Sequence, residues 1–270
     1  MRPRTARAAH LLASAAVAAV LALSVAGCKI TGDDITGSIG ASSAPRSDAD
    51  WRRSLDTWAT RYRENPADID IAINYAQALR ATDQRAQAVA VLEQASIRNP
   101  HSMPLLGAYG RALAEAGDYN QALDVLGRAH TPDQPDWRIL NAQGAVLDQL
   151  GRHAEARRHY SAALKIVPND PSILSNLGLS YALTKDLRRA EATLRQALAR
   201  PSATPKVRQN LALVVGLQGR FAEAEKIASA DQPPDEAAAN VTYLRQMLAQ
   251  RGDWPKKGGR QIVPSPDAGT

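Results

Sequence analysis

A period of 34 residues runs through most of the chain and constrains its fold more than any other feature. The same spacing links a column of small residues and a column of large apolar residues. Self-similarity at a fixed period of this length indicates an array of repeats, in which each unit buries its apolar face against its neighbours. The columns are Ala88, Ala122, Ala156, Ala190 and Ala224; Ala76, Gly110, Gly144, Gly178 and Ala212; and Leu79, Leu113, Leu147, Tyr181 and Val215.

The composition favours helices for these repeats. Hydrophobic residues make up 44% of the 270 residues but aromatic residues only 4%, so the apolar content is mostly aliphatic and alanine. Such a mixture suits close-packed helices better than a β-sandwich. Gly117, Gly151 and Gly219 mark the expected turn within a repeat, because glycine commonly ends a helix. Asp83 and Lys185 stand at the same position in two other repeats.

The repeats resemble the tetratricopeptide repeat. The clearest copy is Leu177-Gly178-Leu179-Ser180-Tyr181, followed by Ala190, Leu194 and Ala197. The resemblance implies an all-α fold, a superhelical solenoid of about five helix–turn–helix repeats over residues 48–251. The segment 51–65 predicts a leading helix, and the segment after Pro233-Pro234 predicts a closing helix that ends near residue 251.

The amino-terminal segment has the pattern of an export signal. Three arginines within residues 2–7 precede an uncharged stretch of 15 residues, 11–25, which is short for a membrane span. Val25-Ala26-Gly27-Cys28 resembles a bacterial lipobox, which implies removal of residues 1–27, acylation of Cys28 and an outer-membrane anchor facing the periplasm. An ordinary signal peptide with a free thiol at Cys28 is the alternative. The polar segment 28–47 predicts a flexible tether, and residues 252–270 predict a disordered tail.

The charge balance and the motifs exclude several functions. Removal of residues 1–27 would lower the formal net charge from +6 to +3, so nucleic-acid binding is not expected. Nucleophile, metalloprotease and phosphate-loop motifs are absent from the sequence, and we expect neither an enzyme nor a bound metal or cofactor. We expect solvent-facing positions for every Asp and Glu, and ordinary structural roles for His153 and His159.

The first helices of such repeats form a concave surface that can hold a peptide. An asparagine recurs there at one repeat position, and its amide can pair with a ligand backbone or brace the neighbouring helix. The leucines can hold an apolar partner or pack on the closing helix. The positions implied by the family register are Asn74, Gln77, Arg111, Arg138, Asn141, Asn176, Leu179, Leu183, Asn210, Leu213 and Leu217.

The lipobox, the tether, the leading helix with its exit at Arg61–Pro66 and the repeat run together resemble the repeat lipoproteins of tight-adherence (Tad, Flp-type) pilus assembly. That resemblance implies an adaptor for proteins of a pilus or secretion complex, including the secretin, without a catalytic step. A scaffold for cell-wall hydrolases or envelope biogenesis is the alternative.

Overall fold

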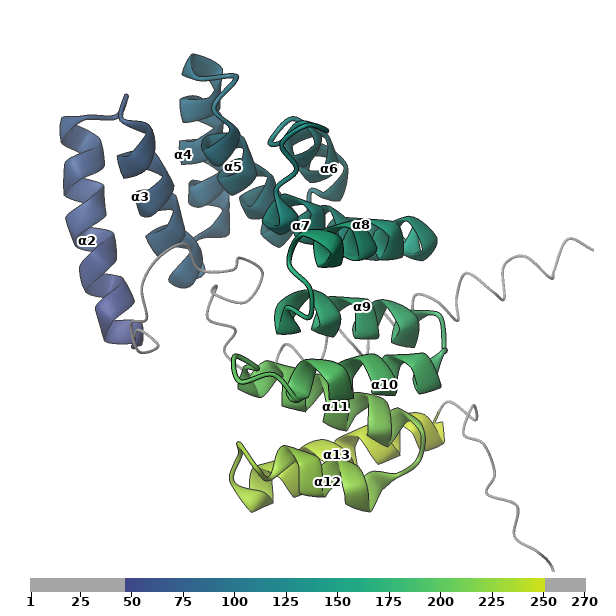
Figure 1. Cartoon of the computed structure of the whole chain (residues 1–270). Helices are drawn as coiled ribbons and strands as arrows, with labels where there is room; N and C mark the ends of the chain where they lie inside the picture. Colours follow the sequence, from purple (N-terminus) through teal and green to yellow (C-terminus); the bar gives the residue numbers. More distant parts are fainter. Residues whose placement is uncertain (1–46, 251–270) are drawn as a thin grey trace, which may run out of the picture. The chain divides into compact units, whose positions relative to one another are not determined.

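The computed structural model describes residues 47–250, and its regular structure there consists of twelve α-helices (Figure 1). This confirms the predicted all-α fold. The predicted signal peptide, the predicted lipidation site Cys28, most of the predicted tether and the predicted tail lie outside the described residues. The helices are α2 (Asp48–Glu64), α3 (Ile69–Ala81), α4 (Arg85–Arg98), α5 (Met103–Ala116), α6 (Tyr119–Gly127), α7 (Trp137–Gln149), α8 (His153–Ile166), α9 (Pro171–Leu183), α10 (Leu187–Leu198), α11 (Pro205–Leu217), α12 (Phe221–Ala228) and α13 (Pro234–Gln250).

The described chain forms two compact units that divide after Val207, within α11. In the first unit each helix packs on the next, so that α3–α4, α5–α6, α7–α8 and α9–α10 form four helix pairs. The first helices of these pairs, α3, α5, α7 and α9, also contact one another in order, and the leading helix α2 packs on α3. This arrangement is the repeat stack that the period predicts.

The small-residue column lies where the two helices of a pair approach most closely. A Cβ atom on Gly144 would lie 2.5 Å from Cε1 of Tyr160, and one on Gly178 would lie 2.7 Å from Cγ of Leu194. Gly110 has the same relation to Leu126. The column that has alanine in all five copies, from Ala88 to Ala224, is fully buried. Residues without bulk therefore let the helices of each pair come together.

The turn between the two helices of a pair requires a left-handed residue. Gly117, Gly151 and Gly219 have φ values of 91°, 75° and 85°. Asp83 and Lys185 adopt the same conformation, with φ values of 62° and 64°, although a side chain disfavours it. The turn geometry is thus retained where the glycine is not.

The third repeat is preceded by an irregular segment. The helix α6 ends at Gly127, earlier in its repeat than α8 or α10, and residues 130–135 form bends without a helix before Asp136 caps α7. Pro132 and Pro135 lie in this segment and remove backbone donors that a helix needs. The 34-residue period survives because the irregular segment takes the place of the missing helical turn.

The second unit holds the rest of α11 together with α12 and α13. Its closest approach is at Gly216, where a Cβ atom would lie 2.5 Å from Cδ2 of Leu244 on α13. Ala212, Ala228 and Ala237 form its small apolar cluster. The Arg208 Nε atom lies 2.5 Å from Oδ2 of Asp231 and ties α11 to the end of α12.

Candidate functional site

The first helices of the first unit bring together several charged side chains. Arg80 on α3 forms a two-point ion pair with Glu115 on α5, in which Nε lies 2.6 Å from Oε2. These two side chains are only 7% and 13% exposed. Bidentate pairs of arginine with a carboxylate are among the stronger polar contacts in proteins. The pair therefore fixes α3 against α5 beside the residues predicted for the groove.

Arg111 lies on α5, close enough to Arg80 and Glu115 for their charges to affect its pKa. Its Nε atom is buried and has no hydrogen-bond partner within residues 47–250. Burial lowers the pKa of Arg111 to about 10, with a further contribution from the positive charge of Arg80. Asp136 and Glu115 act in the opposite direction, and Arg138 adds repulsion. Arg111 is thus a desolvated cation next to other cations.

Arg138 is the neighbouring cation on α7. Its guanidinium carbon lies 4.6 Å from the centre of the Trp137 ring, a cation–π distance. Its Nε atom is buried without a hydrogen-bond partner in the described part of the chain. The carboxylate of Asp136 accepts a hydrogen bond of 2.7 Å from the backbone N–H of Arg138, which caps α7. The nearby acid is therefore already engaged at the start of the helix.

Two predicted asparagines meet across the next helix contact. Asn176 on α9 donates through Nδ2 to Oδ1 of Asn141 on α7, at 3.0 Å, and Asn141 is 4% exposed. This contact favours the bracing role for Asn176, and it leaves the amide nitrogen of Asn141 and the amide oxygen of Asn176 for other bonds. Asn74 donates to the backbone oxygen of Asp70 on its own helix.

The structure brings only part of the predicted set together. Arg111 lies near Arg138, and Asn141 contacts Asn176. Gln77 is exposed on α3, and Leu179 and Leu183 are half-buried on α9. The remaining predicted positions are half-buried in the second unit and are described with it: Asn210, Leu213 and Leu217.

Some residues of the cluster escaped the sequence analysis. Arg80, Glu115 and Asp136 are not among the predicted groove positions. The partners Arg80 and Glu115 are 35 residues apart, as are Asn141 and Asn176. A search for polar pairs separated by one period plus one residue would have found both contacts.

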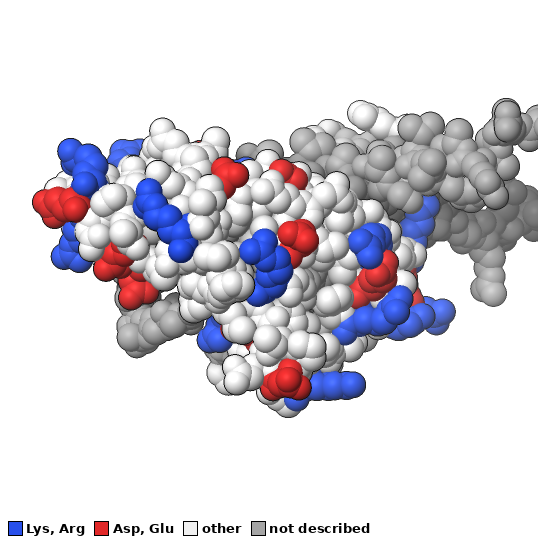
Figure 2. Space-filling view, turned by 90° about the horizontal axis from the view of Figure 1, so that it is seen from above, with Lys and Arg blue, Asp and Glu red and all other residues white. Residues whose placement is uncertain are grey.

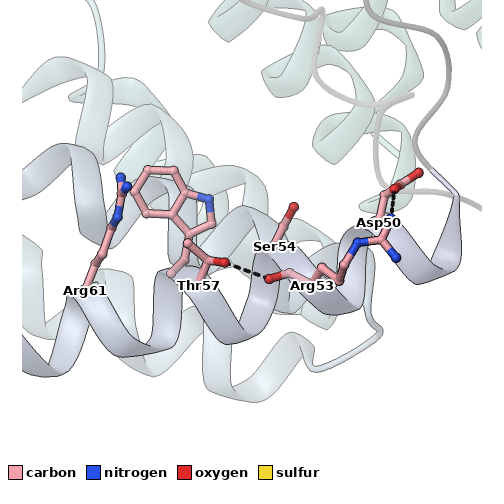
Figure 3. Close-up of a pocket in the computed structure, with 6 residues that line it drawn as sticks. Asp50, Arg53, Ser54, Thr57 and Arg61 are labelled. Atoms are coloured by element: carbon pink, nitrogen blue, oxygen red, sulfur yellow. Dashed lines mark hydrogen bonds and ion pairs between the residues drawn. The ribbon is translucent and has the colours of Figure 1, made fainter.

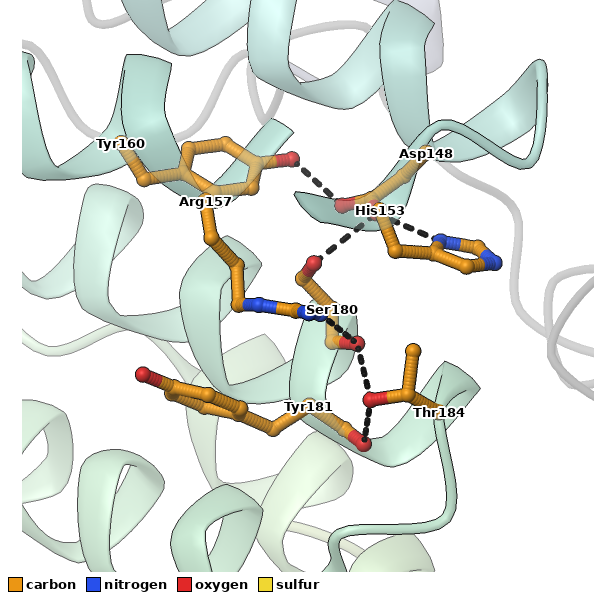
Figure 4. A network of polar contacts seen from close by, with 7 residues as sticks. All are labelled: Asp148, His153, Arg157, Tyr160, Ser180, Tyr181 and Thr184. Carbon is orange, nitrogen blue, oxygen red and sulfur yellow. Dashed lines mark hydrogen bonds and ion pairs between the residues drawn. The ribbon is translucent and has the colours of Figure 1, made fainter. Parts of the chain in front are cut away.

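The expectation that every acid faces solvent is wrong at Asp148, which is buried near the end of α7 (Figure 4). Its carboxylate accepts hydrogen bonds from the Tyr160 hydroxyl at 3.0 Å and the Ser180 hydroxyl at 2.8 Å, and Nδ1 of His153 lies 2.8 Å away. Burial raises the pKa of Asp148 despite these donors. The cluster joins the three helices α7, α8 and α9. Ser180 donates to the acid and not to His153, so the cluster lacks the hydrogen-bond order of a catalytic triad.

A shallow hollow runs along the leading helix α2 (Figure 3). Arg53 pairs with Asp50 at 2.5 Å, and the guanidinium carbon of Arg61 lies 4.9 Å from the centre of the Trp58 ring. Each of these contacts joins residues of one helix. The hollow therefore lacks groups from a second element that would converge on a ligand.

The described residues give further facts about metals, membranes and charge. Residues 47–250 contain no group of three or more His, Cys, Asp or Glu side chains placed to hold a metal ion. Among the same residues, no helix combines the length and the apolar character that a membrane span requires. Figure 2 shows a face on which Lys and Arg alternate with Asp and Glu, so that face carries no extended field of one sign.

The chain is similar to known repeat proteins. A family model described as a tetratricopeptide repeat matches residues 79–144, and a second, described as a TPR repeat, matches residues 144–184. A comparison with curated proteins found no match.

Solved structures show the same fold. A tetratricopeptide repeat protein from Parabacteroides merdae is 14% identical with a TM-score of 0.63, covering 72% of this chain and 78% of that chain. PilW, titled a widely conserved type IV pilus biogenesis factor, is 16% identical with a TM-score of 0.63, covering 72% and 91%. The APC/C complex Cut9-Hcn1 is 15% identical with a TM-score of 0.59, covering 76% and 44%. The family models thus identify tetratricopeptide repeats within residues 79–184, and the solved structures show that the helix pairs of this chain share the fold of such repeat proteins.

Proposed function

We propose that the protein is an outer-membrane lipoprotein that binds partner proteins on the first helices of its repeats, in assembly or localisation of a Flp/Tad pilus secretion machinery. One observation carries the binding role. The contacting helices α5, α7 and α9 carry two arginines whose buried Nε atoms have no hydrogen-bond partner in the described chain, followed by a pair of asparagines. Such groups suit the side chains and backbone of a bound segment.

Two observations support the pilus context. The lipobox and the tether resemble those of the Tad lipoproteins, and PilW, whose title names a type IV pilus biogenesis factor, has the same fold. A lipid anchor at Cys28 would hold the repeats at the membrane leaflet. Confinement of this kind raises the effective concentration of any partner inserted in the same membrane.

Site-specific photo-crosslinking in the native bacterium tests the binding surface. A photoreactive amino acid at Gln77 on α3, or at Leu179 on α9, should capture a pilus or secretion protein. The matched control is Ile97, which is 75% exposed on the second helix α4. Equal capture from Ile97, or none from the first helices, would contradict the proposal. Capture of cell-wall hydrolases would replace the pilus role with the alternative scaffold.

Two genetic experiments test the remaining parts of the proposal. Deletion of the gene should abolish surface pili or secretin multimers, so unchanged piliation would count against the pilus role. Cys28→Ser should prevent acyl labelling and release the protein from outer-membrane fractions. A variant that still takes up labelled acyl groups would exclude lipidation at Cys28.

A further inference from the structure

Arg111 and Arg138 lie on the contacting helices α5 and α7, and the buried Nε atom of each has no hydrogen-bond partner within residues 47–250. The two carboxylates whose charges act on Arg111, Glu115 and Asp136, also make other contacts. Glu115 is held by Arg80 through two hydrogen bonds, and Asp136 caps α7 through the backbone of Arg138. The arginine pair, defined as Arg111 and Arg138, therefore carries positive charge, and at Arg111 the charges of Asp136 and Glu115 offset burial and repulsion only in part.

This arrangement is unfavourable in the free protein. A guanidinium that loses water without gaining a partner costs free energy, and a second cation nearby adds repulsion. The depressed pKa of Arg111 has these same two causes. The Arg138 side chain is also held in place, because its guanidinium stacks on the Trp137 ring. An anion that binds at the arginine pair would therefore meet at least one donor that is already ordered, with little loss of its side-chain entropy.

We infer that the arginine pair binds an acidic side chain, Glu or Asp, within an internal segment of the partner protein. The inference rests on the proposed function, because it assigns the chemistry of the partner held on the first helices. Arginine suits a carboxylate because its planar fork offers two parallel donors. Partner binding would complete the charge compensation that Glu115 and Asp136 provide only in part.

The position of the pair within the surface favours an internal segment over a chain end. The helices α3, α5, α7 and α9 contact one another in order, so α5 and α7 lie in the middle of the row. A segment that crosses the row places its central residues at the arginine pair. On the α9 side it would then reach the amide groups that Asn141 and Asn176 leave unused, which can pair with a peptide backbone.

Peptide binding to the purified protein tests this inference. The probe is a short fluorescein-labelled peptide of alternating Glu and Ala with both ends blocked, measured by fluorescence anisotropy. We expect it to bind at least about tenfold more tightly than the same peptide with Gln in place of Glu. An all-Ala peptide with a free carboxyl terminus tests the other source of a carboxylate, and its tighter binding would overturn the choice of a side chain.

Matched arginine variants locate the binding. Arg111→Met and Arg138→Met should each weaken the Glu peptide about tenfold or more, since methionine keeps much of the apolar stem but removes the charge. The control is Arg188→Met, which removes one positive charge from an exposed position on α10. An equal loss from Arg188→Met would show a diffuse charge effect and overturn the site. Loss of the helical circular dichroism spectrum in a variant would disqualify that variant, and the other arginine variant then decides.

Thermal unfolding gives a second readout that a structural arginine would not produce. Because the buried charge of Arg111 is only partly compensated, Arg111→Met should raise the melting temperature of the free protein by about 2–4 °C while it weakens peptide binding. A lower melting temperature together with unchanged peptide binding would mean that Arg111 serves the fold. If crosslinking from Gln77 captures a partner but the Glu peptide does not bind, the acidic specificity fails while the proposed function stands.

Discussion

The helix pairs α7–α8 and α9–α10 use the same 34-residue columns but join their helices through different chemistry. In α9–α10, Leu194 fills the space beside Gly178, and Ala182 stands at the position that corresponds to Asp148. In α7–α8, Tyr160 fills that space and its hydroxyl donates to Asp148. Of the two pairs, only α7–α8 contains a buried acid.

The difference shows how a polar contact can extend beyond one repeat. The apolar pair joins two helices, whereas Asp148 on α7 also contacts His153 on α8 and Ser180 on α9. In a repeat array, stability depends on the interfaces between neighbouring units. The α7–α8 pair therefore has part of its stability tied to the next repeat, and a residue-by-residue exchange between the two pairs can measure this dependence.

The largest expected effect comes from removal of the buried acid. Asp148→Ala leaves the hydroxyls of Tyr160 and Ser180 buried without an acceptor, and each such loss costs about 1–3 kcal/mol. We expect the free energy of unfolding to fall by about 3 kcal/mol in urea titrations followed by circular dichroism. The double variant Asp148→Ala/Tyr160→Leu copies the apolar pair and should recover about half of that loss. No recovery would contradict the comparison.

A second prediction concerns the glycine at the closest approach. Gly144→Ala places a Cβ 2.5 Å from the rigid Tyr160 ring, whereas Gly178→Ala places one 2.7 Å from Cγ of the more flexible Leu194 and 3.3 Å from the backbone oxygen of Ala190. Overpacking against a ring costs about 1–3 kcal/mol, and the higher helix propensity of alanine offsets about 1 kcal/mol. We expect Gly144→Ala to lower the free energy of unfolding by about 2 kcal/mol and Gly178→Ala by less than about 1 kcal/mol. Equal losses would show that Tyr160 moves as readily as Leu194.

The turns of the two pairs allow an exchange of smaller effect. Gly151 and Lys185 occupy the same left-handed position, with φ values of 75° and 64°. A side chain there costs about 1 kcal/mol, partly offset by the greater freedom of glycine in the unfolded chain. Lys185→Gly should therefore raise the free energy of unfolding by about 0.5 kcal/mol, and Gly151→Lys should lower it by about 1 kcal/mol. A stabilising Gly151→Lys would mean that the turn changes conformation between repeats.

The sequence predicted the features that the two pairs share and missed those that distinguish them. The columns of small and apolar residues locate the helices, their closest approach and the turns, because packing at a fixed period requires the same residue types every 34 residues. Asp148 does not belong to such a column, and the corresponding residue of the next repeat is Ala182. An acid near the end of a helix has the pattern of a solvated residue, and its burial depends on Tyr160 and Ser180, which lie 12 and 32 residues away. Arg111 and Arg138 were both predicted as groove positions, but the charges around them were not, because these depend on where Arg80, Glu115 and Asp136 lie in the folded chain.

The smallest expected effect is a difference in pH dependence between the two second helices. His159 on α8 corresponds to Thr193 on α10, which does not titrate in this range. Burial lowers the pKa of His159, and the nearby His130 adds to this effect. Both histidines have a buried Nδ1 atom without a hydrogen-bond partner in the described residues.

The sign follows from proton binding. A histidine whose pKa is lower in the folded protein binds fewer protons than in the unfolded chain, so its contribution to stability is lost as the pH falls below the ordinary histidine value of about 6.5. Between neutral and mildly acidic pH, the free energy of unfolding should therefore fall less for His159→Thr than for the parent protein. Urea titrations at the two pH values measure this difference. Glu155 acts in the opposite direction on the pKa of His159, and Arg158 and Arg152 act with burial. The control His101→Thr replaces an exposed histidine outside both pairs, and an equal change from that variant would mean that the dependence does not arise at the α7–α8 pair.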